Sequence, residues 1–141
     1  MLILSIALLA ACGKHIESVQ LQGYSMRPNF DDGQIFLIEK VALDKLQHGD
    51  LVLVGIGEKQ WIKRLVGLPN ETISIHDGSV FIDGVLLDEP YEVIPPTYTM
   101  QEIKLDNNSY FVLGDNGPNS ADSRVWGAIS GDSIIGKATL S

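Results

Sequence analysis

Closely spaced turn signals divide the chain into short apolar runs, and this spacing limits what it can fold into. Runs rich in β-branched and aromatic residues alternate with clusters of Asp, Asn, Gly and Pro, and they occupy residues 19–21, 34–40, 50–55, 60–66, 72–76, 79–82, 110–113 and 133–140. Strands of this length between turn residues are typical of antiparallel sheets. We therefore expect a mainly β fold of bent antiparallel sheets with very little helix, limited to a short turn at 42–47.

Turn chemistry adds detail to this expectation. Asp-Gly pairs at 77–78 and 83–84 each separate two apolar runs, and Asp-Gly is favoured in two-residue hairpin turns. The segment 91–108 contains two adjacent prolines and is predicted to be an extended excursion or a loose hairpin on the surface.

Composition excludes several classes of function. A chain of 141 residues is large enough for one domain, and its formal net charge of −8 opposes a phosphate backbone, so no nucleic-acid partner is expected. One cysteine cannot form an internal disulfide, and the three histidines are far apart in sequence, so neither a disulfide framework nor a metal site is predicted. Any chemistry must come from ordinary side chains, without a cofactor.

The N-terminal residues 1–13 are predicted to be a hydrophobic, membrane-directed segment, and residues 14–141 a single β-rich catalytic domain. Residues 1–11 carry no charged side chain and are followed by Cys12. As a helix the segment would reach only ~20 Å across a hydrocarbon core of ~30 Å. It resembles either a lipoprotein signal with a lipidated Cys12 or the outer end of an anchor helix; the alternative is a buried N-terminal element of the domain.

The first of three candidate motifs is Gly-Tyr-Ser-Met-Arg-Pro at residues 23–28. Gly23 allows a close backbone approach and the proline fixes the following turn, so Ser25 is expected to be exposed, with its N–H turned toward a substrate carbonyl. Taken alone, the motif is more typical of a solvated turn serine.

The second motif lies in the predicted strand 60–66. Alternation places three side chains on one face of this strand, Trp61, Lys63 and Leu65. Burial among apolar neighbours, together with repulsion from the adjacent Arg64, should lower the pKa of Lys63. A pKa of ~8 would correspond to a destabilisation of the ammonium form by roughly 3 kcal/mol and would let the lysine act as a base. The alternative is an edge-strand lysine whose tip reaches water.

The third motif is a polar loop at residues 114–127, Gly-Asp-Asn-Gly-Pro-Asn-Ser-Ala-Asp-Ser-Arg-Val-Trp-Gly. We expect Asp122 and Arg124 to form charge-assisted hydrogen bonds and Ser120 to turn its hydroxyl toward the lysine, so that the loop is a rigid polar brace. The alternative is a solvent loop held by Asx turns.

In this order and spacing, the three motifs resemble those of the bacterial type I signal peptidases, membrane-bound serine proteases with a Ser-Lys dyad. The resemblance also includes Gly-Asp at 49–50 and Gly-Leu-Pro at 67–69, so it covers nearly all of the chain after the N-terminal segment. The chain departs from the common pattern of the family at Asn29, at residues 70–71 and at residues 117–118.

The resemblance implies a role for each motif residue. Ser25 resembles the nucleophile, Lys63 the general base, and Ser120 the hydroxyl that orients the lysine. The supporting ion pair is implied at Asp122 and Arg124. Because residue 23 is glycine, the implied oxyanion hole relies on backbone N–H groups, chiefly that of Ser25, and the implied substrate-binding and oxyanion positions are Gly23, Tyr24 and Met26.

The implied activity is removal of N-terminal signal peptides from exported preproteins, on the extracytoplasmic side of the cell membrane and through an acyl-enzyme. The partners would be membrane lipid and signal peptides bound as extended strands, with small residues before the cut. Two alternatives are a self-cleaving Ser-Lys regulator and an idle β lipoprotein that binds extended peptides. The regulator would need an upstream DNA-binding domain, and the joint presence of Ser25 and Lys63 argues against an idle protein.

The N-terminal segment leads to a prediction about location. Because residues 1–11 are apolar, we expect the protein to fractionate with membranes. If Cys12 is lipidated, mass spectrometry of the mature protein should show a diacylglyceryl group and no residues 1–11. Membrane-bound protein with an unmodified Met1 would instead identify an anchor helix, and protein found only in the soluble fraction would contradict both.

Overall fold

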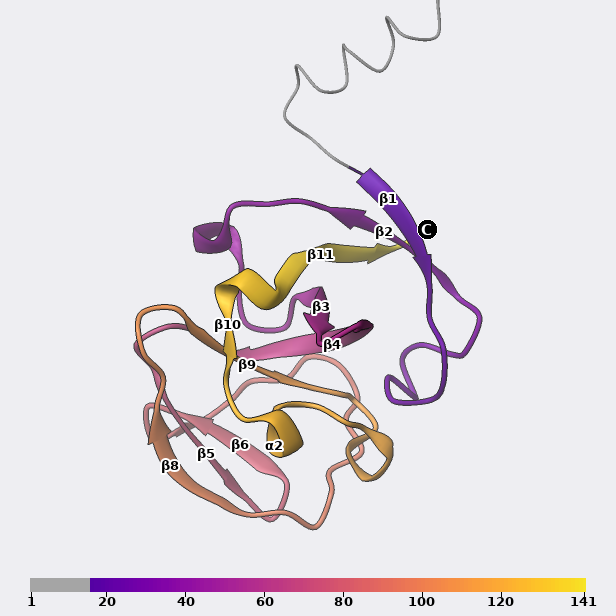
Figure 1. Cartoon of the computed structure of the whole chain (residues 1–141). Helices are drawn as coiled ribbons and strands as arrows, with labels where there is room; N and C mark the ends of the chain where they lie inside the picture. Colours follow the sequence, from indigo (N-terminus) through magenta and orange to yellow (C-terminus); the bar gives the residue numbers. More distant parts are fainter. Residues whose placement is uncertain (1–15) are drawn as a thin grey trace, which may run out of the picture.

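The computed structural model describes residues 16–141, which form two antiparallel sheets (Figure 1). The larger sheet has the strand order β1-β2-β11-β3-β4-β9-β10. Its strands are β1 (Ile16–Gln20), β2 (Ile35–Glu39), β3 (Leu51–Ile56), β4 (Lys59–Gly67), β9 (Ser109–Leu113), β10 (Ile129–Ser130) and β11 (Ile134–Leu140). The smaller sheet has the order β7-β6-β5-β8, with β5 (Thr72–His76), β6 (Ser79–Ile82), β7 (Val85–Leu86) and β8 (Met100–Lys104).

Helix is limited to four short elements of the described chain. One is the α-helix α2 (Ser123–Trp126), and the others are the 3-10 turns η1 (Leu43–Lys45), η2 (Gly117–Asn119) and η3 (Gly131–Ser133). The expected mainly β class with very little helix is therefore confirmed, and the single predicted turn at 42–47 contains η1.

The predicted strands agree with the structure where turn chemistry marks both ends. The runs 72–76 and 79–82 match β5 and β6, and the hairpin turns after each have positive φ at both Asp and Gly, as a type I′ turn requires. The segment 91–108, predicted as an extended excursion or loose hairpin on the surface, contains the largely exposed edge strand β8, which was not predicted as a strand. A β-bulge in its pairing with β5 places Met100 and Ile103 three residues apart, which hides the alternation of a strand.

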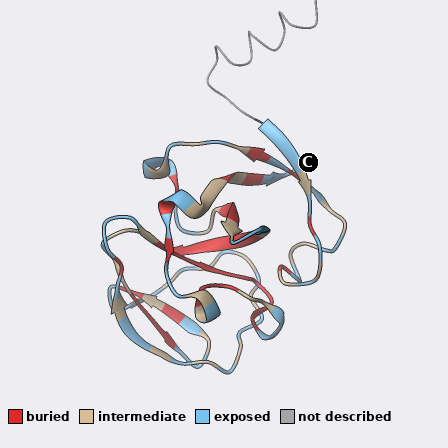
Figure 2. Ribbon diagram, viewed as in Figure 1, coloured by how far each residue is buried: buried red, intermediate tan, exposed pale blue. Residues whose placement is uncertain are grey.

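Strand β4 lies in the larger sheet between β3 and β9 and is largely buried (Figure 2). Its buried hydrophobic residues belong to three separate clusters. Ile62 packs with Met26, and Val66 packs with residues of β5, β6 and β9. Leu65 packs in the third cluster, with residues of β3 and β9. β9 pairs with β4 only from Arg64 to Gly67, but the Lys63 side chain is itself fully buried. The alternative of an edge-strand Lys63 whose tip reaches water is therefore wrong.

The predicted membrane-directed segment, residues 1–13 with Cys12, lies outside the described residues. Within residues 16–141 no helix combines the length and the apolar character needed to cross a membrane.

Candidate active site

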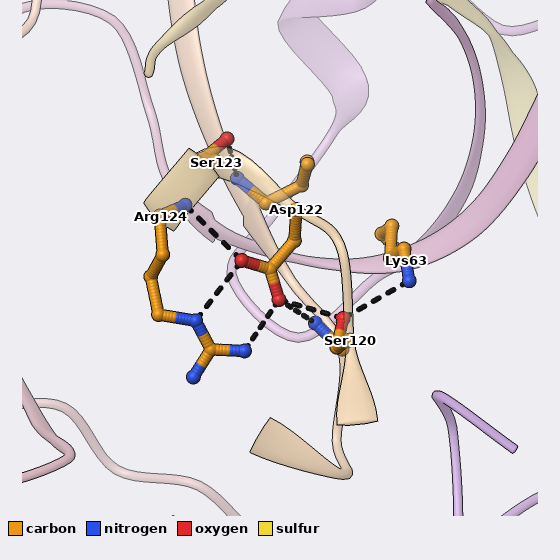
Figure 3. A network of polar contacts seen from close by, with 7 residues as sticks. Lys63, Ser120, Asp122, Ser123 and Arg124 are labelled. Atoms are coloured by element: carbon orange, nitrogen blue, oxygen red, sulfur yellow. Dashed lines mark hydrogen bonds and ion pairs between the residues drawn. The ribbon is translucent and has the colours of Figure 1, made fainter. Parts of the chain in front are cut away.

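Lys63 reaches the centre of the site from β4 with no part of its surface exposed. Its Nζ donates a hydrogen bond to Ser120 Oγ over 3.0 Å, although 57 residues separate the two in sequence (Figure 3). The Trp61 ring lies on the same side of the strand, with its centroid 5.4 Å from Nζ. The lysine is thus held between an apolar wall and the hydroxyl of the 114–127 loop.

The surroundings of Lys63 lower its pKa from 10.5 to about 8. Burial is the largest cause, because it removes water from the ammonium form; Arg124 also lowers the pKa, while the carboxylates of Asp122 and Asp115 raise it. The direction agrees with the sequence prediction, but one expected cause was wrong. Arg64 is not among the groups that shift this pKa, because it points to the opposite face of β4 and pairs with Asp115.

Asp122 is the centre of the predicted brace and is completely buried. One carboxylate oxygen, Oδ2, accepts from Ser120 Oγ at 2.7 Å and from the Gly114 N–H at 2.9 Å. The other, Oδ1, accepts from the backbone N–H and the Nε of Arg124, at 3.1 and 3.0 Å, so Asp122 also caps α2 (Figure 3). The structure thus brings together Lys63, Ser120, Asp122 and Arg124 as one hydrogen-bonded network.

Gly114 makes room for this network. A Cβ at this position would lie 2.1 Å from Ser120 Oγ and 2.7 Å from the carbonyl oxygen of Ser25. Only glycine fits between these groups, and the close approach brings the Ser25 segment next to the hydroxyl that holds Lys63.

Ser25 lies in a turn closed by the hydrogen bond from the Arg27 N–H to the Tyr24 carbonyl, 3.2 Å long. It is half-buried and lines a cavity of about 640 Å³, whose walls include Gly23, Leu53, Trp61 and Ile62. Within residues 16–141 no hydrogen bond joins Ser25 Oγ to Lys63. The serine and the lysine are therefore brought into one region through Gly114 and Ser120 rather than by a direct bond.

The three other predicted substrate-binding and oxyanion residues differ in their exposure and in their contacts. Gly23 has a φ of +86° and lines the cavity, but its N–H is already bonded to Asp32 Oδ1 at 2.7 Å. Tyr24 is 53% exposed, with its ring beneath the Arg27 guanidinium at 4.2 Å. Met26 is fully buried in a hydrophobic cluster, where it anchors the turn from below.

Sequence reasoning missed a second buried ion pair. Arg64 contacts both carboxylate oxygens of Asp115, at 2.5 and 3.2 Å, donates to the Gly49 carbonyl at 3.0 Å, and lies 3.9 Å above the Tyr91 ring. The available signal was the alternation of β4, which places Arg64 opposite Lys63 on an interior strand and so requires a buried acidic partner. This pair fastens the start of the 114–127 loop to the other face of β4.

Comparisons with known proteins agree with this geometry. A family model described as "Signal peptidase, peptidase S26" matches residues 1–141. The chain is 34% identical over 147 residues to "Signal peptidase I T" of Bacillus subtilis, covering 92% of this chain and 76% of that protein. It is 31% identical over 132 residues to "Probable signal peptidase I-2" of Synechocystis sp., covering 86% of this chain.

A solved structure is also similar to this chain, and the relatives differ in how much of their length this chain spans. The crystal structure of a signal peptidase I from Enterococcus faecalis superposes with a TM-score of 0.59 at 30% sequence identity, covering 70% of this chain and 100% of that one. The chain spans 61% and 64% of the length of two Synechocystis relatives.

The buried brace leads to a prediction about stability. Asp122→Ala should lower the free energy of unfolding by roughly 3–5 kcal/mol, because the Arg124 side chain, only 8% exposed, loses its partner. Arg124→Ala should cost less, since the Asp122 carboxylate keeps the Gly114 and Ser120 donors. Urea denaturation at pH 7 measures both.

The exposed ion pair of Arg27 with Asp31 supplies the matched control. These side chains are 49% and 64% exposed, so Asp31→Ala should cost less than about 1 kcal/mol. Equal losses for Asp122→Ala and Asp31→Ala would show that the buried pair does not brace the loop.

Proposed function

Because the chain belongs to the signal peptidase family, peptidase S26, we propose that it is a serine endopeptidase that removes signal peptides from exported preproteins. The observation that carries the proposal is the completely buried Lys63, whose pKa is lowered to about 8 and whose amine is held by Ser120. A protein without catalytic use for this amine would gain stability by replacing it with an apolar side chain. The buried amine therefore argues against the alternative of a catalytically idle protein that only binds extended peptides.

The hydrogen-bond directions of the network suit a lysine base. The Ser120 hydroxyl donates its proton to the Asp122 carboxylate, so its oxygen is left to accept from Lys63. A neutral amine has two N–H bonds and one lone pair, and donation to Ser120 uses an N–H. The lone pair of Lys63 therefore stays available to take a proton from Ser25.

In the proposed reaction, neutral Lys63 removes the proton of Ser25 Oγ as this oxygen forms a bond to the scissile carbonyl carbon. Backbone N–H groups, that of Ser25 in particular, stabilise the oxyanion. The C–N bond then breaks, the leaving amine takes the proton from Lys63, and an acyl-enzyme remains. A water molecule that the same lysine deprotonates hydrolyses the ester and frees Ser25.

The cavity beside Ser25 supports an extended peptide as substrate. It runs between the end of β1, an edge strand of the larger sheet, and strand β4. A peptide that adds to such an edge is bound through its backbone, while shallow pockets choose its side chains. We propose that the substrates are signal peptides with small residues before the cut, presented at the extracytoplasmic side of a membrane.

Ser25→Ala tests the nucleophile. The variant should keep its melting temperature, since a half-buried hydroxyl contributes little packing, and should lose cleavage of a preprotein by a factor on the order of 10⁶. Ser79→Ala is the control, because Ser79 is an exposed strand serine of the smaller sheet. Cleavage after an Ala-X-Ala site by wild type and Ser79→Ala, but not by Ser25→Ala, is the expected result. Wild-type turnover by Ser25→Ala would exclude this nucleophile.

The pH dependence of kcat/KM tests the base. Below the lowered pKa of about 8 the lysine is protonated, so kcat/KM should fall about tenfold per pH unit, and it should level off above pH 9. Lys63→Arg should be as inactive as Lys63→Met, because a guanidinium stays protonated and cannot accept the serine proton. Lys45→Arg, at an exposed lysine in η1, is the control. An active Lys63→Arg variant with a flat pH profile would rule out Lys63 as the base.

A further inference from the structure

Asn116 holds the peptide groups on both sides of Ser25. Its side-chain Nδ2 donates to the carbonyl of Tyr24 over 3.0 Å, and its backbone N–H donates to the carbonyl of Ser25 over 2.9 Å. The first carbonyl belongs to the Tyr24–Ser25 peptide group, and the second belongs to the Ser25–Met26 peptide group. One residue, 91 or 92 positions away in sequence, therefore binds both peptide groups of the proposed nucleophile, and the Tyr24 carbonyl also accepts the local turn bond from the Arg27 N–H.

Fixing a carbonyl also fixes the direction of the N–H in the same peptide group. The Tyr24–Ser25 peptide bond is trans, because the cis bond recorded in the described chain is Arg27–Pro28. In a planar trans peptide the C=O and the N–H point in opposite directions. The bond from Asn116 Nδ2 to the Tyr24 carbonyl thus directs the Ser25 N–H away from Asn116.

The Ser25 N–H is free for a ligand. Among the described residues it has no acceptor, whereas the N–H of Gly23 is bonded to Asp32. A backbone donor that points away from the protein's own acceptors and lies beside the cavity is suited to a carbonyl oxygen that gains negative charge.

Asn116 is itself rigidly held. It is only 7% exposed, forms a β-bridge with Ile94, and accepts from the Asn119 N–H at 2.9 Å. Its neighbour Asp115 is fixed by the buried pair with Arg64. Because these contacts fix Asn116, its side-chain amide can hold the Tyr24–Ser25 peptide group in one orientation, as an oxyanion donor requires.

We propose that Asn116 is the positioning residue of the oxyanion hole, whose side-chain amide orients the Ser25 N–H toward the oxyanion of the substrate. This inference rests on the proposed function and adds a residue that touches neither substrate nor lysine. Loss of the side chain keeps the backbone bond to the Ser25 carbonyl and leaves the Tyr24 carbonyl only its local turn bond from the Arg27 N–H, so the Tyr24–Ser25 peptide group is held less firmly. The transition state should then lose stabilisation while ground-state peptide binding stays intact.

The experiment compares wild type with Asn116→Ala and Asn116→Asp, the second of which keeps the size but cannot donate from an ionised carboxylate. Three quantities are measured: kcat and KM for an Ala-X-Ala peptide, the inhibition constant of the matching peptide aldehyde, and the dissociation constant of the peptide for each variant in the Ser25→Ala background. The aldehyde reports the oxyanion site, because Ser25 Oγ adds to its carbonyl carbon while Lys63 takes the Oγ proton. The carbon becomes tetrahedral, and the former carbonyl oxygen is left in the position of the oxyanion.

We expect kcat to fall about 10- to 100-fold and the aldehyde inhibition constant to rise by a similar factor, somewhat less than for deletion of an oxyanion donor. KM and the dissociation constant should change less than about twofold. For Asn116→Ala the pH at which kcat/KM levels off should not move, since this substitution adds no charge near Lys63. Asn29→Ala is the matched control, because it removes bonds to the Glu92 carbonyl and Asp115 Oδ2 from the same region but none to Tyr24.

The outcomes separate this inference from the proposed function. If wild type cleaves the peptide and either folded Asn116 variant keeps wild-type kcat and aldehyde affinity, the positioning role is overturned and the proposed function stands. Equal weakening of aldehyde and peptide, or the same loss in Asn29→Ala, would show a merely structural role. If wild type neither cleaves the peptide nor binds the aldehyde, the proposed function is wrong and this inference with it.

Discussion

Lys63 carries its amine into the interior of the larger sheet, on a strand flanked by β3 and β9, with no exposed surface. Lowering its pKa from 10.5 to about 8 corresponds to a cost of about 3 kcal/mol for the ammonium form at neutral pH. The surrounding groups limit this cost without removing it. The Asp122 carboxylate favours the charge, while burial and Arg124 oppose it, and the balance leaves an amine that can lose its proton near pH 8.

The two faces of β4 are fastened to the same loop by different means. On the face of Lys63, Ser120 and Asp122 connect the loop to the amine. On the opposite face, Arg64 binds Asp115 at the start of the loop. The loop therefore cannot shift relative to β4 without exposing or unpairing a buried charge, which is costly. This double attachment gives Gly114 and Asn116 the fixed positions from which they contact the Ser25 segment.

Much of the fold and part of the site followed from local patterns. Turn residues and β-branched runs marked β5 and β6 at their ends, and the alternation of β4 placed Lys63 on an apolar face. The sequence-based predictions failed where residues distant in sequence determine the local structure or the local charge. The strand β8 is defined by its pairing with β5 across a bulge, and the charge that opposes the ammonium of Lys63 comes from Arg124, not from the neighbouring Arg64.

Residue types and spacing within each motif made Ser25, Lys63 and the 114–127 loop candidates, because strand alternation and turn preferences act over a few residues. Their roles followed from the resemblance of the three motifs together to the signal peptidases. The contacts that join them act over far larger separations, 57 residues for Lys63 with Ser120 and 92 for Asn116 with Tyr24. No local preference encodes such distances. They exist only once the sheet has closed, because the burial of Lys63 and Arg64 on β4 forces these two charged side chains to find partners in the loop.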